Sequence, residues 1–130
     1  MTNQDVIEMV AIKGYYHPYD YEPCRLIKQL GELDEHGYSK SGNRIIALIN
    51  PQAASVTLNL CLGAPWNAAF QASPIFYAGP EQPLMPGHPT RTERVATAIV
   101  EAEETLLRAY RILAVNPDST QEKEEQQPCK

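Results

Sequence analysis

The chain has 130 residues, enough for one folded domain but not for two. It carries 11 lysines and arginines against 16 acidic residues, a net charge of −5. This balance argues against a general nucleic-acid binder and against a protein held on anionic membranes, but it leaves room for a local basic pocket. We expect a single domain over residues 1–115 and a disordered tail over 116–130, because the tail is polar, charged and free of aromatic residues.

Cysteine usage and the first residues bear on the compartment. Cys24, Cys61 and Cys129 are an odd number at wide spacing, which fits neither a disulfide framework nor a zinc site. The N-terminus lacks the basic and apolar regions of a secretory signal, and no apolar run approaches the roughly 18 residues of a membrane span. We therefore expect a cytoplasmic protein that does not associate with membranes and holds no metal or cofactor.

The first quarter of the chain predicts a strand followed by a helix. Residues 5–12 carry β-branched and apolar side chains and are followed by Gly14, a pattern that favours a strand. Pro23 suits the first turn of a helix that would end before Gly37. Apolar residues recur at helical spacing between them, at Leu26, Ile27, Leu30 and Leu33.

The next segment predicts an antiparallel hairpin. Residues 44–50 are apolar on both alternating faces, as in a strand covered on both sides. Residues 55–61 place Val56 and its alternate neighbours on an apolar face and polar residues on the other. Asn50, Pro51 and Gln52 between the two segments are turn residues.

Residues 62–90 form a long proline-rich connection, which we interpret as a strap packed on the core. Pro65 could open a short helix, and Leu84 and Met85 are expected to face the core. Prolines recur at an interval of three, as in a polyproline II segment. The expected anchors are aromatic: Trp66, Phe70, Phe76 and Tyr77.

A helix from about Arg91 to Ala114 is the clearest element. Thr90 and Glu93 have the spacing of a capping box at its start. Its apolar arc is wider than one contact on a small sheet needs, so we favour a homo-oligomer joined through this helix. The alternative is a single helix buried between the sheet and the first helix. The expected interface residues are Val95, Ile99, Ala102, Leu106 and Leu113.

These elements together predict an α+β fold. A small antiparallel sheet, built in the order strand, helix and β-hairpin, would pack against the long C-terminal helix.

A cluster of tyrosines is the densest anomaly in the sequence. The segment GYYHPYDY, residues 14–21, holds four phenols, which suit stacking on a planar ring or an amphipathic protein interface. The alternative is a loop whose tyrosines pack over the edge of the core. The candidate ligand-binding residues here are Tyr15, Tyr16, His17, Tyr19 and Tyr21.

Three arginines could supply the charge for an anionic ligand: Arg44, Arg91 and Arg94. Arg91 and Arg94 lie in the first helical turn, where basic residues oppose the helix dipole, and this suggests a bound anion or an acidic partner. The alternative is that they are solvent-exposed or form a surface pair of the Arg94 to Glu101 type.

The sequence does not favour catalysis. It contains no phosphate-binding, dinucleotide-binding or nucleophile-elbow motif, and its three histidines lack metal-ligand spacing. Glu103 falls inside the apolar arc of the long helix, so it should reach the rim or pair with an arginine. A catalytic site assembled in space from residues such as Asp20 or Glu103 remains an open alternative.

Three functions follow from these residues. The first is a small, non-catalytic, homo-oligomeric protein that binds a nucleotide-like anionic molecule through tyrosine stacking and arginine contacts. The second is an adaptor or inhibitor that binds another protein through its aromatic and proline-rich loops. The third is a small hydrolase.

Overall fold

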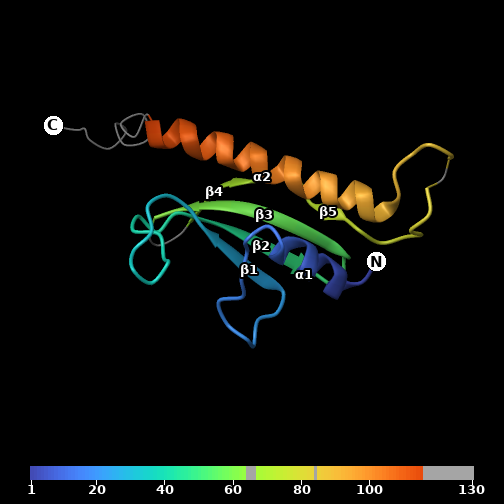
Figure 1. Ribbon diagram of the computed structural model, residues 1–130, viewed down its shortest axis with the longest axis horizontal. Coiled ribbons are helices and arrows are strands. Elements are labelled where there is room, and N and C mark those ends of the chain that lie inside the picture. The colour runs from blue at the N-terminus through green and yellow to red at the C-terminus, as the bar shows by residue number, and fades with distance from the viewer. Residues whose placement is uncertain (64–66, 84, 116–130) are drawn as a thin grey trace.

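The computed structural model describes residues 1–63, 67–83 and 85–115. Two helices lie on one face of an antiparallel sheet with the strand order β1-β2-β3-β4, in which β5 also pairs with β3 (Figure 1). This two-layer arrangement confirms the predicted α+β class. The elements are α1 (Asn3–Ala11), β1 (Arg25–Gln29), β2 (Arg44–Asn50), β3 (Ser55–Leu62), β4 (Asn67–Gln71), β5 (Ile75–Phe76) and α2 (Arg91–Val115).

The first element is a helix, so the strand predicted over residues 5–12 is wrong. Thr2 caps α1: its Oγ1 accepts a hydrogen bond from the backbone N–H of Asp5, and the Asp5 carboxylate accepts one from the N–H of Thr2. The apolar residues Val6 and Val10 are one helical turn apart and are both fully buried. The reciprocal cap and this spacing outweigh the β-branched composition of the segment.

The helix predicted to begin at Pro23 is also wrong, because its first apolar residues form strand β1. Leu26 and Ile27 are adjacent in sequence and buried on opposite faces of the sheet. Leu26 packs in the core, and Ile27 lies on the other face, with its backbone paired to Tyr16 of the preceding loop. Leu33, the last residue of the supposed helical face, lies in the loop after β1 and is 48% exposed.

The predicted hairpin is confirmed as β2 and β3, which pair from Arg44↔Cys61 to Asn50↔Ser55. The Asn50 side chain accepts hydrogen bonds from the backbone N–H groups of Gln52 and Ala53 and so shapes the turn. The expectation that β2 is covered on both faces is wrong. Leu48 is 42% exposed, because both helices lie on the face opposite its side chain.

The long connection after β3 contains two short strands, β4 and β5, which pair with β3 and form one edge of the sheet. The short helix predicted after Pro65 is wrong, since residues 67–71 form β4. Among the expected anchors, Tyr77 is buried and donates a hydrogen bond to the Asn3 side chain, whereas Phe70 and Phe76 are exposed. Met85 is also exposed, and Trp66, Leu84 and Cys129 lie outside the described residues.

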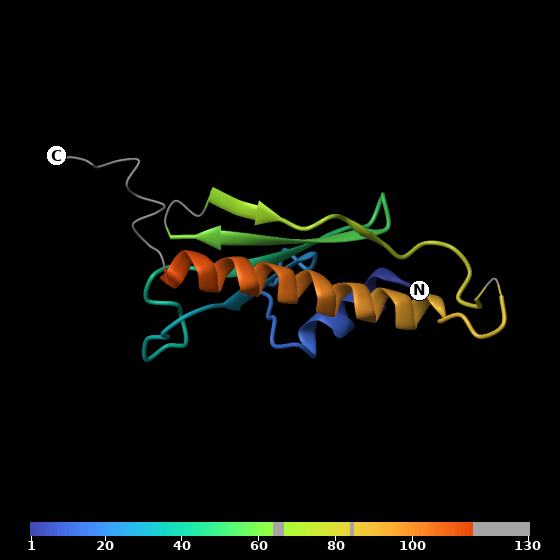
Figure 2. The same ribbon diagram turned by 90° about the horizontal axis from the view of Figure 1, so that it is seen from above.

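The long helix α2 agrees with the prediction, including the capping box of Thr90 and Glu93. It runs the length of the molecule over β3, β4 and β5 (Figure 2). Val95, Ile99 and Leu106 are at most 2% exposed and belong to the core of this chain. The core of this chain therefore accounts for these three expected interface residues without a second copy. The helix expected to cover the other side of α2 in the single-helix alternative does not exist, because its residues 25–29 form strand β1.

Candidate functional site

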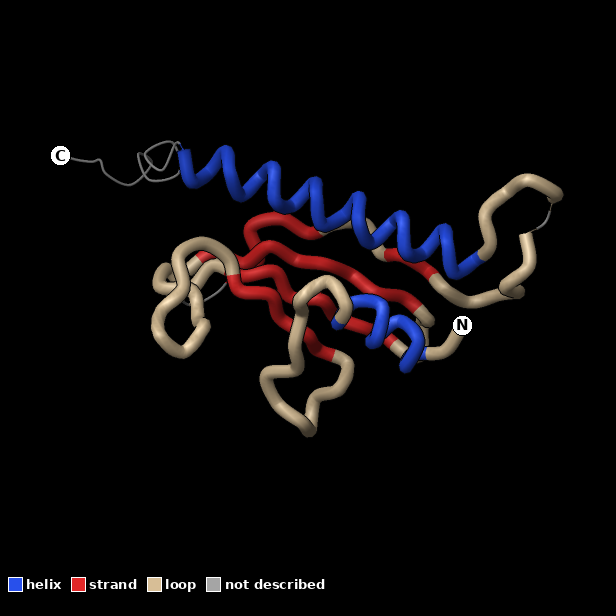
Figure 3. The backbone as a smooth tube through the Cα atoms, in the orientation of Figure 1, coloured by secondary structure: helices blue, strands red, loops and turns tan. Residues whose placement is uncertain are grey.

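A hollow of about 500 Å³ lies on the face of the sheet away from α1 and α2. We call it the tyrosine hollow. Two loops stand beside it, the one between α1 and β1 and the one between β1 and β2 (Figure 3). The residues that line it are Tyr16, Pro18, Tyr19, Arg25, Ile27, Gln29, Tyr38, Arg44 and Ile46.

The floor of the tyrosine hollow follows from strand alternation. Every second residue of a strand faces the same side, so Arg25, Ile27 and Gln29 of β1 share the open face. The register pairs Ile27 with Ile46 and Gln29 with Arg44. Two isoleucines thus form an apolar floor, with a guanidinium near either end of it.

The loop after α1 forms one wall because Tyr16 pairs with the outer edge of β1. Its backbone N–H donates to the Ile27 carbonyl at 3.0 Å, and the Ile27 N–H donates to the Tyr16 carbonyl at 2.8 Å. This pairing makes the loop strand-like at this point, so neighbouring side chains point to opposite faces. Tyr15 enters the core, and Tyr16 lines the hollow.

The two walls are tied together through Gln29. Its side-chain amide donates a hydrogen bond to the Tyr16 hydroxyl at 2.8 Å, and its carbonyl oxygen accepts one from the Ser39 N–H at 2.9 Å. The residue before Ser39, Tyr38, is held by Asp34, whose side chain accepts a hydrogen bond from the Tyr38 N–H. This hydrogen bond, together with that from His36, keeps the pKa of Asp34 below its usual value. Hydrogen bonds within the chain therefore hold the two walls of the hollow in place.

Arg25 and Arg44 give the hollow its charge. Arg25 forms an ion pair with Glu22 at 3.5 Å, and both side chains are partly exposed. Arg44 is half-buried and lies opposite Cys61 on β3. Burial raises the pKa of the Cys61 thiol, although the charge of Arg44 opposes that shift. At neutral pH this cysteine is therefore a buried thiol and not an activated nucleophile.

Three of the eight expected ligand residues line the hollow: Tyr16, Tyr19 and Arg44. His17 and Tyr21 lie in the same loop but do not line it. His17 closes the loop through a 2.8 Å hydrogen bond between its Nε2 and the Pro23 carbonyl. Tyr21 stacks on Tyr19, with ring centroids 5.4 Å apart.

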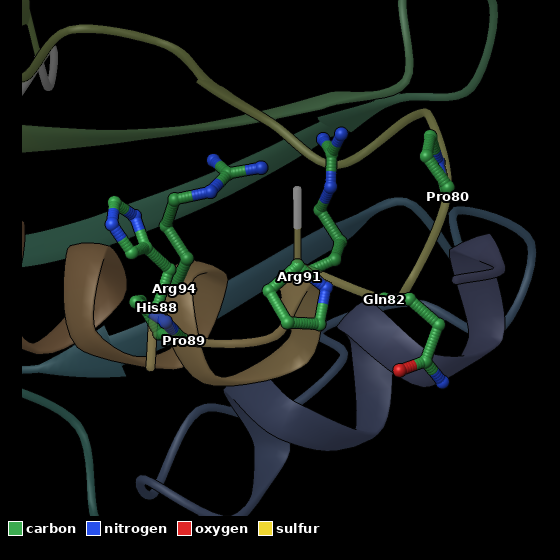
Figure 4. Close-up of a pocket in the computed structure, with 7 residues that line it drawn as sticks. Pro80, Gln82, His88, Pro89, Arg91 and Arg94 are labelled. Atoms are coloured by element: carbon green, nitrogen blue, oxygen red, sulfur yellow. The ribbon is translucent and has the colours of Figure 1, made fainter. Parts of the chain in front are cut away.

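Arg91 and Arg94 do not lie at the tyrosine hollow. They line a separate cavity of about 300 Å³ under the proline-rich strap, with His88 and several prolines (Figure 4). Both guanidinium groups point to the same side of the helix start, whereas Gln82 points away from them. The Arg91 Nη1 atom donates to the Phe76 carbonyl at 3.4 Å, and the Nη2 atom of the same guanidinium lies against Gly79.

The start of α2 already has anionic partners from its own chain. The Glu81 carboxylate accepts a hydrogen bond from the Thr92 N–H at 2.9 Å, and this contact holds the pKa of Glu81 below its usual value. The Glu93 carboxylate accepts the N–H of Thr90. The two acids compensate the helix dipole that Arg91 and Arg94 oppose.

A second polar cluster is buried between β1 and α2. The Lys28 ammonium lies 2.6 Å from the Glu103 Oε2 atom, and the Tyr15 hydroxyl donates to the same oxygen at 3.3 Å. Burial, and then the Glu103 charge, raise the pKa of Tyr15 above its usual range. The ion pair expected for Glu103 is thus present, with a lysine in place of an arginine.

Sequence reasoning missed most of the floor of the hollow, namely Arg25, Ile27, Gln29 and Ile46, and also Tyr38 on its wall. In a helix over residues 22–37 the side chains of Arg25, Ile27 and Gln29 would point in different directions, whereas in a strand they share one face. The alternation of Arg25, Ile27 and Gln29 was the signal that could have found this face.

No family model matches the chain, and neither the curated proteins nor the solved structures contain a significant match to it. In the described part of the chain, no helix is both long and apolar enough to cross a membrane. Within the same residues, no three side chains among histidines, cysteines and acids are grouped to hold a metal ion. The function must therefore be argued from the geometry of the hollow.

Proposed function

We propose that this protein binds a small anionic molecule with a planar ring, of the nucleotide type, in the tyrosine hollow. The observation that carries the proposal is the convergence of three tyrosines and two arginines around an apolar floor. The volume of the tyrosine hollow, about 500 Å³, lies within the roughly 300–1,000 Å³ common for small-molecule sites.

The chemistry of the lining fits the two parts of such a ligand. Tyr16 and Tyr19 are 37% and 51% exposed, so each has ring surface free for stacking. A guanidinium binds a phosphate or carboxylate through parallel hydrogen bonds, and Arg25 and Arg44 stand at the ends of the floor. A ring placed over Ile46, beside the buried Ile27, would have its anionic group at an arginine.

Thermal stability with defined probes tests this proposal. A ligand that binds only the folded state raises the melting temperature, and we expect adenosine monophosphate to do so more than adenosine or inorganic phosphate alone. Tyr19→Ala and Arg25→Gln should each reduce that shift. Phe70→Ala and Arg111→Gln, which change an exposed ring and an exposed arginine outside the hollow, are the matched controls.

The hollow variants and the controls distinguish binding in the tyrosine hollow from binding elsewhere. Shifts that the hollow variants reduce and the controls leave intact support the site. The proposal fails if no nucleoside monophosphate stabilises the wild type, or if the Phe70→Ala control loses the shift as fully as Tyr19→Ala does.

A further inference from the structure

We infer that a second copy of this chain docks along the edge of the sheet formed by β4 and β5, with the two α2 helices antiparallel across a twofold axis. This inference does not rest on the proposed ligand. It concerns a flank of α2 that includes one of the residues expected to join two copies, Ala102, but not Val95, Ile99, Leu106 or Leu113.

The surface is a groove of about 710 Å³ between residues 71–76 and one flank of α2. We call it the edge groove. The helix side is lined by Arg91, Arg94, Ala98, Glu101, Ala102 and Thr105. The helix α2 contacts both β4 and β5. Figure 2 shows it running in the same direction as the sheet, with β3 between it and β4 in that view.

The sheet is open at this edge. β4 is the last strand in the order β1-β2-β3-β4, and β5 pairs with β3, so in the described residues no strand occupies their outer side. Unpaired backbone groups on an edge strand favour pairing with a further strand. Phe70 and Phe76, both about half-exposed, lie on this edge and add apolar surface to it.

The charges along the α2 flank make the groove self-complementary. Arg94 lies toward its N-terminal end and Glu101 toward its C-terminal end, with Ala98 between them. In an antiparallel helix pair whose axis passes between Thr97 and Ala98, Arg94 of each copy lies opposite Glu101 of the other. A twofold interface uses one patch twice, so two identical ion pairs form. The small Ala98 at the centre permits close approach of the helices.

Arg94 and Glu101 do not form an ion pair with each other within one chain. Seven residues separate them along α2, which is two turns or about 10 Å, whereas side chains three or four residues apart are neighbours on a helix. Among the ion pairs of the described residues, neither Arg94 nor Glu101 takes part. A second copy therefore offers each charge the partner that its own chain lacks, which favours this occupant over an unrelated protein.

Charge reversal combined with mass measurement in solution tests the inference. The wild type should have twice the 14.5 kDa mass of one chain in sedimentation or light scattering. Arg94→Glu and Glu101→Arg should each weaken the dimer by about tenfold or more, because like charges then face each other twice. The double variant R94E/E101R restores opposite charges across the axis and should regain the dimer.

Arg111→Glu is the matched control: it reverses the charge of another exposed arginine of α2 outside the edge groove and should leave the dimer intact. Far-ultraviolet circular dichroism shows that each variant is folded. A monomeric wild type at concentrations well above micromolar overturns the inference, as does a dimer that withstands Arg94→Glu. Failure of R94E/E101R to recover overturns the antiparallel register.

Discussion

Lys28 on β1 and Glu103 on α2 form an ion pair at 2.6 Å that joins the sheet to the long helix across 75 residues of sequence. The Tyr15 hydroxyl shares the same carboxylate oxygen, and the Lys28 ammonium lies 5.5 Å from the centre of the Tyr15 ring. Three distant segments therefore meet at one acid. Because Glu103 faces the core, its charge is tolerated only with these partners in place.

Glu103→Gln should lower the free energy of unfolding by about 2 kcal/mol. This is less than the roughly 3–5 kcal/mol for breaking a fully buried pair, since the Lys28 side chain is 31% exposed. Urea unfolding of Glu103→Gln, Lys28→Met and the double variant would give a coupling energy of about 1–2 kcal/mol. Additive losses would show that the two side chains contribute independently.

Alkaline pH should weaken the fold through Tyr15. Burial and the Glu103 charge raise its pKa in the folded state, so the folded chain keeps a proton that the unfolded chain releases above about pH 10. The stability that Tyr15 contributes to the folded state is complete below that pH and is lost as the pH rises further. Unfolding measured from pH 8 upwards should show a shallower decline for Tyr15→Phe than for the wild type, and no such change for the exposed Tyr21→Phe.

Leu106→Ala should destabilise the single chain. Its side chain is 2% exposed within the core, and truncation of such a leucine costs about 3 kcal/mol. Glu104→Ala, on the exposed side of the same helix, should stay within about 0.5 kcal/mol of the wild type. An unchanged unfolding free energy together with loss of self-association would instead assign Leu106 to an interface.

Gly79 in the strap lies against the Arg91 guanidinium, so a side chain at this position would displace that group. Gly79 and Gly87 both have positive φ, at 104° and 88°, but only a Cβ at Gly79 would collide with the Arg91 guanidinium. Gly87→Ala should cost about 1–2 kcal/mol from backbone strain. Gly79→Ala should cost only slightly more, because the Arg91 guanidinium is the end of a flexible side chain that can shift, with loss of its hydrogen bond to Phe76. Combining Gly79→Ala with Arg91→Ala should remove the part of the loss in unfolding free energy, measured in urea, that exceeds the loss of Gly87→Ala. If that part persists, it arises from another neighbour of Gly79.

The sequence predicted best where local signals agreed with one another. The capping box at Thr90 and the apolar spacing after it both favour a helix, and α2 follows them. The hairpin was equally consistent, because the turn at Asn50 separates two β-rich segments. In the first quarter the signals conflicted. There the capping box of Thr2 and Asp5 favours a helix, whereas the β-branched composition of residues 5–12 favours a strand.

Strand β1 shows why part of the candidate site could not be predicted. Ile27 is buried on the open face, and its backbone pairs with Tyr16 of the preceding loop, a pairing that no local pattern specifies. The tyrosine cluster is visible in the sequence, but which rings face the hollow depends on that pairing. Tyr15 and Tyr16 are adjacent and take opposite roles for this reason.

The two borders of the sheet are not equivalent. At β1 the Tyr16 segment already satisfies both the N–H and the carbonyl of Ile27, whereas in the described chain the outer side of β4 and β5 has no strand beside it. Addition of chains at both borders would generate an endless ribbon, the hazard that open strands bring. With the middle of one border paired to its own loop, we expect extension of this sheet at the other border, so the proposed self-association would end at a pair.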